Sequence, residues 1–156
     1  MIYVEALKDL QVPTGSVAVF LAGGITNCKD FQSEICGKLK SLPDSLIVFN
    51  PRRANFPMHD SSAAEAQIKW EFTMLRRATV ISFWFPKETL CPICLFELGS
   101  HSMTKKPLVV GTHPEYARRQ DIEVQMSLVR PGLPISDNLD DVIIGIKYWY
   151  GQLRAY

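Results

Sequence analysis

Val17-Ala18-Val19-Phe20-Leu21-Ala22-Gly23-Gly24 is the stretch of sequence that decides the fold. Its first six residues are apolar without interruption, which is typical of a strand buried on both faces of a parallel sheet. The two glycines that follow interrupt the run and allow the backbone to turn closely. The stretch therefore predicts a central strand over residues 17–22 with a turn at its carboxyl end.

Further strands and helices alternate along the rest of the chain. Apolar runs and turn residues predict strands over 1–7 (at a sheet edge), 46–49, 79–85 and 108–110, and helices over 30–42, 62–77, 92–103, 117–128 and 137–150. Asp60 or Ser61 is the expected cap of the second helix. Because strands that alternate with helices form parallel sheets covered on both faces, the predicted fold is α/β and flavodoxin-like, with a doubly wound, mostly parallel five-stranded sheet.

The composition is that of one domain able to bury its own core, and we expect this domain to span residues 1–156. The chain is 47% hydrophobic and 21% charged, with a formal net charge of +1. Such a balance gives no general attraction to a nucleic-acid polymer or an anionic membrane. No stretch reaches the ~18 apolar residues of a membrane helix, and the first residues do not resemble a signal peptide. We therefore expect a cytoplasmic protein with four reduced cysteines.

Glycines and polar residues follow the predicted strands, at the edge where a doubly wound sheet binds its ligand. Ala22-Gly23-Gly24 allows backbone amides to approach a ligand, although a plain strand-to-helix turn has the same composition. Asn50-Pro51-Arg52-Arg53 offers two guanidinium groups to a phosphate or a base, and a solvated basic loop is the alternative. These two segments are the candidate ligand-binding loops.

Three carboxylates are candidates for chemistry near this edge. Glu97 lies in an apolar setting near the start of a predicted helix, and Glu88 directly follows a strand. Glu71 shares a helix face with Gln67, four residues before it. Each of them alone is better explained as a surface residue. If they converge, one carboxylate can attack the anomeric carbon of a sugar while an acid protonates the leaving group.

The motif Cys91-Pro92-Ile93-Cys94 indicates an alternative, a dithiol oxidoreductase, because a helix start stabilises a thiolate. Its late position and the order of the strands around it do not match a redox fold. A zinc site would need a second pair of ligands, and the other cysteines, Cys28 and Cys36, do not supply one at a suitable spacing. We therefore expect buried free thiols, no metal and no cofactor.

Taken in order, segments over roughly residues 17–126 resemble the nucleoside 2-deoxyribosyltransferase-like family. The most specific piece is Glu97-Leu98-Gly99 followed by Lys106-Pro107 and a strand. The other pieces are Phe20-Leu21-Ala22-Gly23-Gly24-Ile25, Asn50-Pro51-Arg52-Arg53, Gln67-Ile68-Lys69-Trp70-Glu71, Phe83-Trp84-Phe85-Pro86-Lys87-Glu88-Thr89, Leu95-Phe96 and His113-Pro114-Glu115-Tyr116.

The resemblance implies a pentosyltransferase that moves deoxyribose between nucleobases with retention. Glu97 would attack C1′ and form a covalent deoxyribosyl-enzyme, from which a free nucleobase or water takes the sugar. Glu71 and Glu88 would hold sugar hydroxyls and handle protons at the base. A polar residue of a neighbouring subunit, at the position of Asp121, would complete the site, which implies a homodimer or a larger homo-oligomer.

Departures from the family pattern leave two alternatives open. Cys-Pro-Ile-Cys stands where better-known members have Asp and Gly, and Glu88 lies further from Glu97 than the usual acidic residue. The arginine pair also differs from the classical nucleoside enzymes and fits either a 5′-phosphorylated substrate or none of the usual ones. The alternatives are therefore an N-glycosidase acting on (deoxy)nucleoside 5′-monophosphates and a non-catalytic nucleotide-binding module. The expected substrate-binding residues are Ala22, Gly23, Gly24, Asn50, Arg52, Arg53, Gln67 and Asp121.

Overall fold

The computed structural model describes residues 1–55 and 61–154, and within them the chain forms a parallel sheet of six strands. The order is β1-β3-β2-β4-β5-β6, and all neighbouring strands are parallel. The predicted flavodoxin-like α/β class is confirmed, with one strand more than expected. The strands are β1 (Ile2–Glu5), β2 (Val17–Gly23), β3 (Leu46–Asn50), β4 (Val80–Phe85), β5 (Leu108–Thr112) and β6 (Ile135–Ser136).

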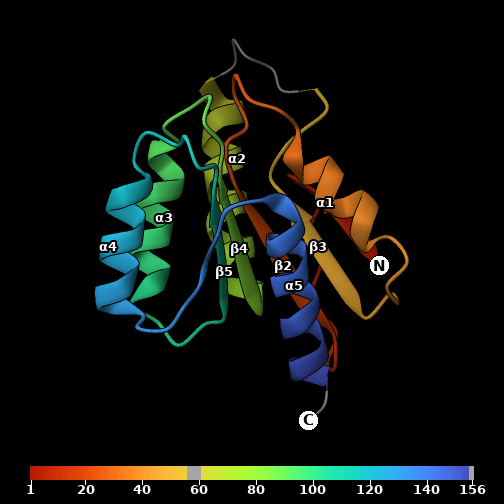
Figure 1. Cartoon of the computed structure of the whole chain (residues 1–156). Helices are drawn as coiled ribbons and strands as arrows, with labels where there is room; N and C mark the ends of the chain where they lie inside the picture. The colour runs from red at the N-terminus through yellow and green to blue at the C-terminus, as the bar shows by residue number, and fades with distance from the viewer. Residues whose placement is uncertain (56–60, 155–156) are drawn as a thin grey trace.

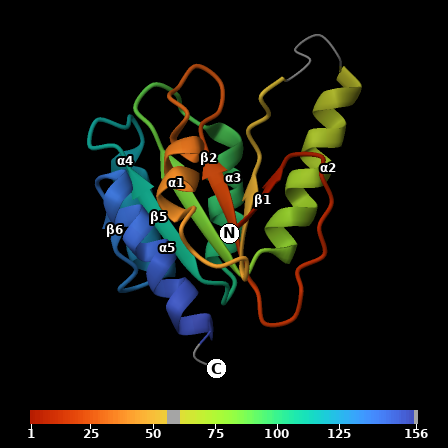
Figure 2. The same ribbon diagram turned by 90° about the vertical axis from the view of Figure 1, so that its right-hand side faces the viewer.

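Helices cover both faces of this sheet (Figures 1 and 2). α2, α3 and α4 pack on one face, and α1 and α5 pack on the other. Of the expected caps of α2, Asp60 lies outside the described residues and Ser61 is the first residue of the helix. None of the helices described is long and apolar enough to cross a membrane. The helices are α1 (Phe31–Leu39), α2 (Ser61–Arg77), α3 (Pro92–Ser102), α4 (Arg119–Val129) and α5 (Leu139–Arg154).

The strand β2 is central and buried along its whole length, as its unbroken apolar sequence predicts. Successive side chains of a strand point to opposite faces. Ala18, Phe20 and Ala22 accordingly pack in the core under α2 and α3, whereas Val19 and Leu21 pack in the core under α1 and α5. Both faces of β2 must therefore be apolar.

The sheet changes winding direction at β2. The chain passes from β2 to its neighbour β3 on one side and returns to β4 on the other, so a crevice is expected at the carboxyl ends of β2 and β4. Gly23 is required there, because its φ is +151° and a Cβ would lie 2.3 Å from the Trp84 carbonyl oxygen and 2.5 Å from Cζ of Phe31. The glycine lets the end of β2 lie tightly between β4 and α1.

Candidate active site

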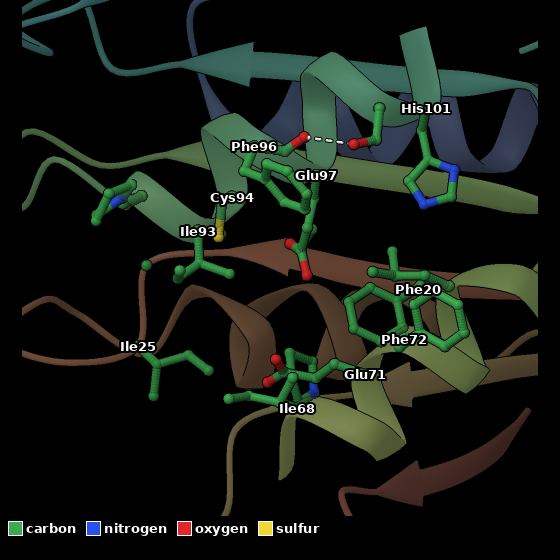
Figure 3. Close-up of a pocket in the computed structure, with 18 of the residues that line it drawn as sticks. Phe20, Ile25, Ile68, Glu71, Phe72, Ile93, Cys94, Phe96, Glu97 and His101 are labelled. Carbon is green, nitrogen blue, oxygen red and sulfur yellow. Dashed lines mark hydrogen bonds between the residues drawn. The ribbon is translucent and has the colours of Figure 1, made fainter. Parts of the chain in front are cut away.

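A cavity of about 740 Å³ opens between α2 and α3 beside the end of β2 (Figure 3). β2 contributes Phe20 and Ala22, and Gly23 and Gly24 line the cavity where the strand ends. The carboxylates of Glu71, from α2, and Glu97, from α3, lie in this cavity. The two are 26 positions apart in the sequence, and the topology of the sheet brings them together.

Glu97 lies in the second turn of α3, a helix that begins with Pro92 in the position where proline is favoured. The neighbouring Leu98 is buried in the core, which fixes the rotation of the helix and leaves Glu97 facing the cavity. Burial, and after it the charge of the nearby Glu71 carboxylate, raises the pKa of Glu97 to about 8, against an interaction with the Cys94 side chain that lowers it. Such a carboxyl group exchanges a proton near neutral pH.

Glu71 faces the same cavity because Trp70 and Met74, its neighbours on α2, are buried in the core. Gln67, one turn earlier, donates from Nε2 to Oε1 of Glu71 at 2.8 Å and to the backbone oxygen of Pro51 at 2.7 Å. Burial raises the pKa of Glu71, and the hydrogen bond from Gln67 lowers it in part. Gln67 thus connects the Glu71 carboxylate to the backbone that follows β3 and holds the carboxylate in place.

The two carboxylates repel each other across the cavity, since the negative charge of Glu71 contributes to the raised pKa of Glu97. Like charges that share a site cannot both ionise freely, so the pair favours a state that retains one proton. One ionised and one protonated carboxyl group are what nucleophilic displacement at an anomeric carbon requires. The arrangement therefore has the elements of glycosidic chemistry.

Replacing Glu71 with glutamine is expected to lower the pKa of Glu97, because a neutral amide removes the repulsion that helps to raise it. The measurement is a pH titration of the Glu97 side-chain carboxyl carbon by NMR, assigned with Glu97→Gln. Glu65→Gln is the matched control, since Glu65 is an exposed residue of α2 that pairs with Lys69. An unchanged pKa of Glu97 in Glu71→Gln would show that the carboxylates are not coupled.

Arg52, predicted to meet a phosphate, is held by the protein itself. Its Nε donates to Oε1 of Gln32 at 3.0 Å and lies 3.2 Å from a carboxylate oxygen of Asp30. Its Nη2 donates to the backbone oxygens of Gly24 at 3.3 Å and Lys29 at 3.2 Å. Arg52 does not line the cavity in the described structure, and it braces the loop between β2 and α1.

The remaining predicted residues also lie outside the cavity lining of the described chain. Asn50 is buried, donates to the Tyr3 hydroxyl at 3.0 Å and accepts the backbone N–H of Arg52 at 2.9 Å. Glu88 is exposed in the loop after β4, and Arg53 is partly buried. Asp121 is exposed in the first turn of α4. From this position it was expected to complete the active site of a neighbouring subunit. Their roles in binding and catalysis stay predictions.

Sequence reasoning missed the apolar walls of the cavity. Ile68 and Phe72 of α2 and Ile93 and Phe96 of α3 line it, and each is more than 60% exposed. Their spacing could have revealed these walls. Ile68 and Phe72 are four residues apart and Ile93 and Phe96 are three apart, so each pair shares one helix face, and this face is not the one that packs in the core. Apolar and aromatic walls with a few polar groups between them are typical of a small-molecule site.

Sequence reasoning also did not identify two basic side chains that line the cavity, one helical turn beyond the carboxylates. Arg76 and His101 line it beyond the carboxylates, and the Arg76 guanidinium lies 5.5 Å from the centre of the Phe72 ring. Burial, with the charges of Lys106 and Arg76, lowers the pKa of His101 and favours its neutral form. This end of the cavity can therefore present an aromatic ring and a neutral imidazole to a ligand.

The four cysteines are free thiols. Burial raises the pKa of Cys91 to about 11 and that of Cys94 still higher, so neither forms the thiolate that a dithiol oxidoreductase uses. Among the described residues, no group of three or more His, Cys, Asp or Glu side chains could hold a metal ion. The carboxylates of Glu71 and Glu97 stay the candidates for chemistry at this site.

The fold and the cavity define a flavodoxin-like α/β protein with a pair of coupled carboxylates beside the switch point of its sheet. The sequence model of the family described as nucleoside 2-deoxyribosyltransferase like matches residues 16–116. This range contains β2 to β5 and both Glu71 and Glu97, and the chain belongs to this family. The family implies nucleoside or nucleotide ligands. No curated protein matches the sequence.

Proposed function

We propose that this protein is a nucleoside 2-deoxyribosyltransferase that moves deoxyribose between nucleobases with retention of configuration. The observation that carries the proposal is the presence of Glu97 and Glu71 in one cavity, with burial and mutual repulsion raising the pKa of Glu97. Membership in the family supports it. Retaining displacement at an anomeric carbon needs a carboxylate nucleophile and a proton donor close together.

The reaction proceeds in two displacements. The ionised carboxylate of Glu97 attacks C1′, the bond between C1′ and the nucleobase nitrogen breaks, and the base leaves with the bonding electrons. The base takes up the proton that the coupled carboxyl pair retains, which Glu71 carries when Glu97 is ionised. A second nucleobase then attacks C1′ from the face that the first one left, its N–H proton passes to Glu71, and the ester to Glu97 breaks. Two inversions give net retention.

The cavity offers different surroundings to the two halves of the substrate. The aromatic rings of Phe72 and Phe96 form apolar walls against which a planar base can pack. The Glu71 carboxylate is a hydrogen-bonding partner for sugar hydroxyls, and Gly23 and Gly24 let the backbone approach the ligand closely. The exposed apolar side chains around the cavity also suit burial against a second copy, consistent with the homo-oligomer and with the role proposed for the partner subunit's Asp121.

Incubation with deoxyadenosine and cytosine is expected to yield deoxycytidine and adenine, separated and quantified by chromatography. Intact mass after mixing with a deoxynucleoside alone is expected to show a deoxyribosyl adduct. Absence of exchange with every base tried would refute the transferase. Release of free base without an acceptor would instead identify an N-glycosidase, and thermal stabilisation by nucleotides that survives Glu97→Ala, without turnover, would identify a binding module.

Hydrolysis of a nucleoside 5′-monophosphate has less support. The guanidinium of Arg52, which was expected to meet the phosphate, is engaged by Gln32, by Asp30 and by two backbone carbonyls. A phosphate would also enter a cavity that holds two repelling carboxylates, where the Arg76 guanidinium already lies over the Phe72 ring. The geometry therefore favours the uncharged nucleoside as donor.

A further inference from the structure

Gln67 supports the cavity from behind its wall. Its side chain is 8% exposed and does not line the cavity in the described structure, although its two partners, Glu71 and Pro51, do. Its Nε2 carries both hydrogens of the amide and donates to the Pro51 carbonyl oxygen at 2.7 Å and to Oε1 of Glu71 at 2.8 Å. A residue that the sequence suggested for substrate binding thus contacts one of the two candidate carboxylates instead.

The Pro51 carbonyl oxygen decides which way this amide faces. A backbone carbonyl oxygen can only accept a hydrogen bond, so the NH₂ group of Gln67 and not its oxygen must face Pro51. The reversed amide would place two acceptor oxygens against each other. The Gln67 oxygen has no partner among the described residues, so no donor there competes to turn the amide round. With one hydrogen on Pro51, the other is committed to Glu71.

This amide determines where Glu71 can carry a proton. A protonated carboxyl group has its hydrogen on one oxygen and accepts hydrogen bonds at the other. Because Oε1 of Glu71 accepts from Gln67, the hydrogen of the protonated form lies on Oε2, the oxygen that Gln67 does not contact. Figure 3 shows Glu71 on the wall of the cavity across from Glu97. The acid hydrogen and the candidate nucleophile are therefore offered to the same space.

The bond from Gln67 strengthens as Glu71 gives up its proton. Hydrogen bonds to an ionised acceptor are stronger than those to a neutral one. When the hydrogen leaves Oε2, negative charge develops on the carboxylate that Gln67 already contacts. An interaction that is stronger in the transition state than in the ground state raises kcat more than it raises affinity.

We propose that Gln67 is a positioning residue, which holds Oε1 of Glu71 so that the acid hydrogen sits on Oε2 and passes from there to the departing nucleobase. The proposal rests on the proposed role of Glu71 as the acid. In the first displacement the electron pair of the C1′–N bond goes to the base, the base takes the hydrogen, and Glu71 remains as a carboxylate. In the second displacement the incoming base returns a proton to Glu71. Gln67 forms no bond to the substrate and exchanges no proton.

The first test compares Gln67→Met and Gln32→Met with two deoxyribose donors. Methionine keeps the length of the side chain but cannot donate, so Gln67→Met should lower kcat with deoxyadenosine about tenfold, with little change in KM. With 7-methyl-2′-deoxyguanosine, whose cationic base leaves without taking a proton, the loss should be at most about twofold. Gln32 is the matched control, because it is a buried glutamine that donates to the Gly24 carbonyl oxygen beside the same cavity. Any loss in Gln32→Met should be the same with both donors.

A second readout needs neither turnover nor a change at Gln67. In Glu97→Gln, where Glu71 titrates without its neighbour, NMR follows the two side-chain amide hydrogens of Gln67. The hydrogen that faces Glu71 should shift downfield as Glu71 ionises, whereas the one that faces Pro51 should change little. In the same background the pKa of Glu71 should be higher with Gln67→Met, since the bond from Gln67 lowers it.

An equal effect of Gln67→Met with both donors, or a Gln67 amide that does not follow the ionisation of Glu71, would overturn the proposal. If the wild type does not use the methylated donor, the amide titration alone decides. Exchange activity absent from the wild type would refute the transferase instead, and the titration would still show whether Gln67 acts on Glu71.

Discussion

Replacing Glu97 with alanine or glutamine is expected to reduce deoxyribosyl exchange by on the order of 10⁴-fold or more, as loss of a covalent nucleophile does in other enzymes. Neither side chain can form the ester to C1′, so the deoxyribosyl adduct should disappear from the intact mass spectrum. Exchange is followed by chromatography with deoxyadenosine as donor and cytosine as acceptor. The cavity itself should persist, since the core contact of α3 is made by Leu98.

Glu65→Gln provides the comparison for this loss. Glu65 is an exposed residue of α2 that pairs with Lys69 and does not line the cavity described. Its replacement should leave both exchange and adduct formation at the wild-type level. Substantial exchange by Glu97→Gln, or an adduct of the same mass in that variant, would show that another group attacks C1′ and would remove Glu97 from the mechanism.

The same substitution, Glu97→Gln, is expected to stabilise the folded protein above neutral pH. In the wild type the folded-state pKa of Glu97, about 8, lies above the 4.5 of an unburied glutamate. Between these pH values the folded state keeps a proton that the unfolded chain releases. Stability therefore falls as pH rises from about 4.5 to 8, and the loss is on the order of a few kcal/mol. Glutamine cannot ionise, so the variant should not suffer this loss.

Thermal melts at several pH values measure this effect. The difference in Tm between Glu97→Gln and the wild type should be small near pH 4.5, grow up to about pH 8 and then level off. Glu65→Gln should show no such trend, because its carboxylate is already exposed. A variant with the same pH dependence of Tm as the wild type would mean that Glu97 ionises in the folded protein as easily as in water.

The meeting of Glu71 and Glu97 follows from topology, and topology follows from the apolar runs. From β3 the chain crosses over β2 to β4 and then continues in the same direction to β5, and such parallel connections are right-handed. α2 and α3 must therefore cover the same face and lie side by side. Once β2 is recognised as central, residues on the inner edges of these two helices are expected to share one cavity.

Other features could not be predicted because they depend on contacts between distant segments. The role of Arg52 is decided by Gln32 and Asp30, which reach it only after α1 has packed on the sheet. The strand β6 has two residues and forms by pairing with β5, so it leaves no periodic signal. Likewise, only the folded chain shows that Glu88 remains exposed while Glu71 is partly buried.

The brace that Arg52 forms has a consequence for ligand affinity. Because its guanidinium already holds the backbone at Gly24 and Lys29, the loop next to the cavity is ordered before a ligand arrives. A preorganised loop spares the ligand the entropy cost of immobilising it. Arg52 can therefore contribute to tight binding without touching the ligand.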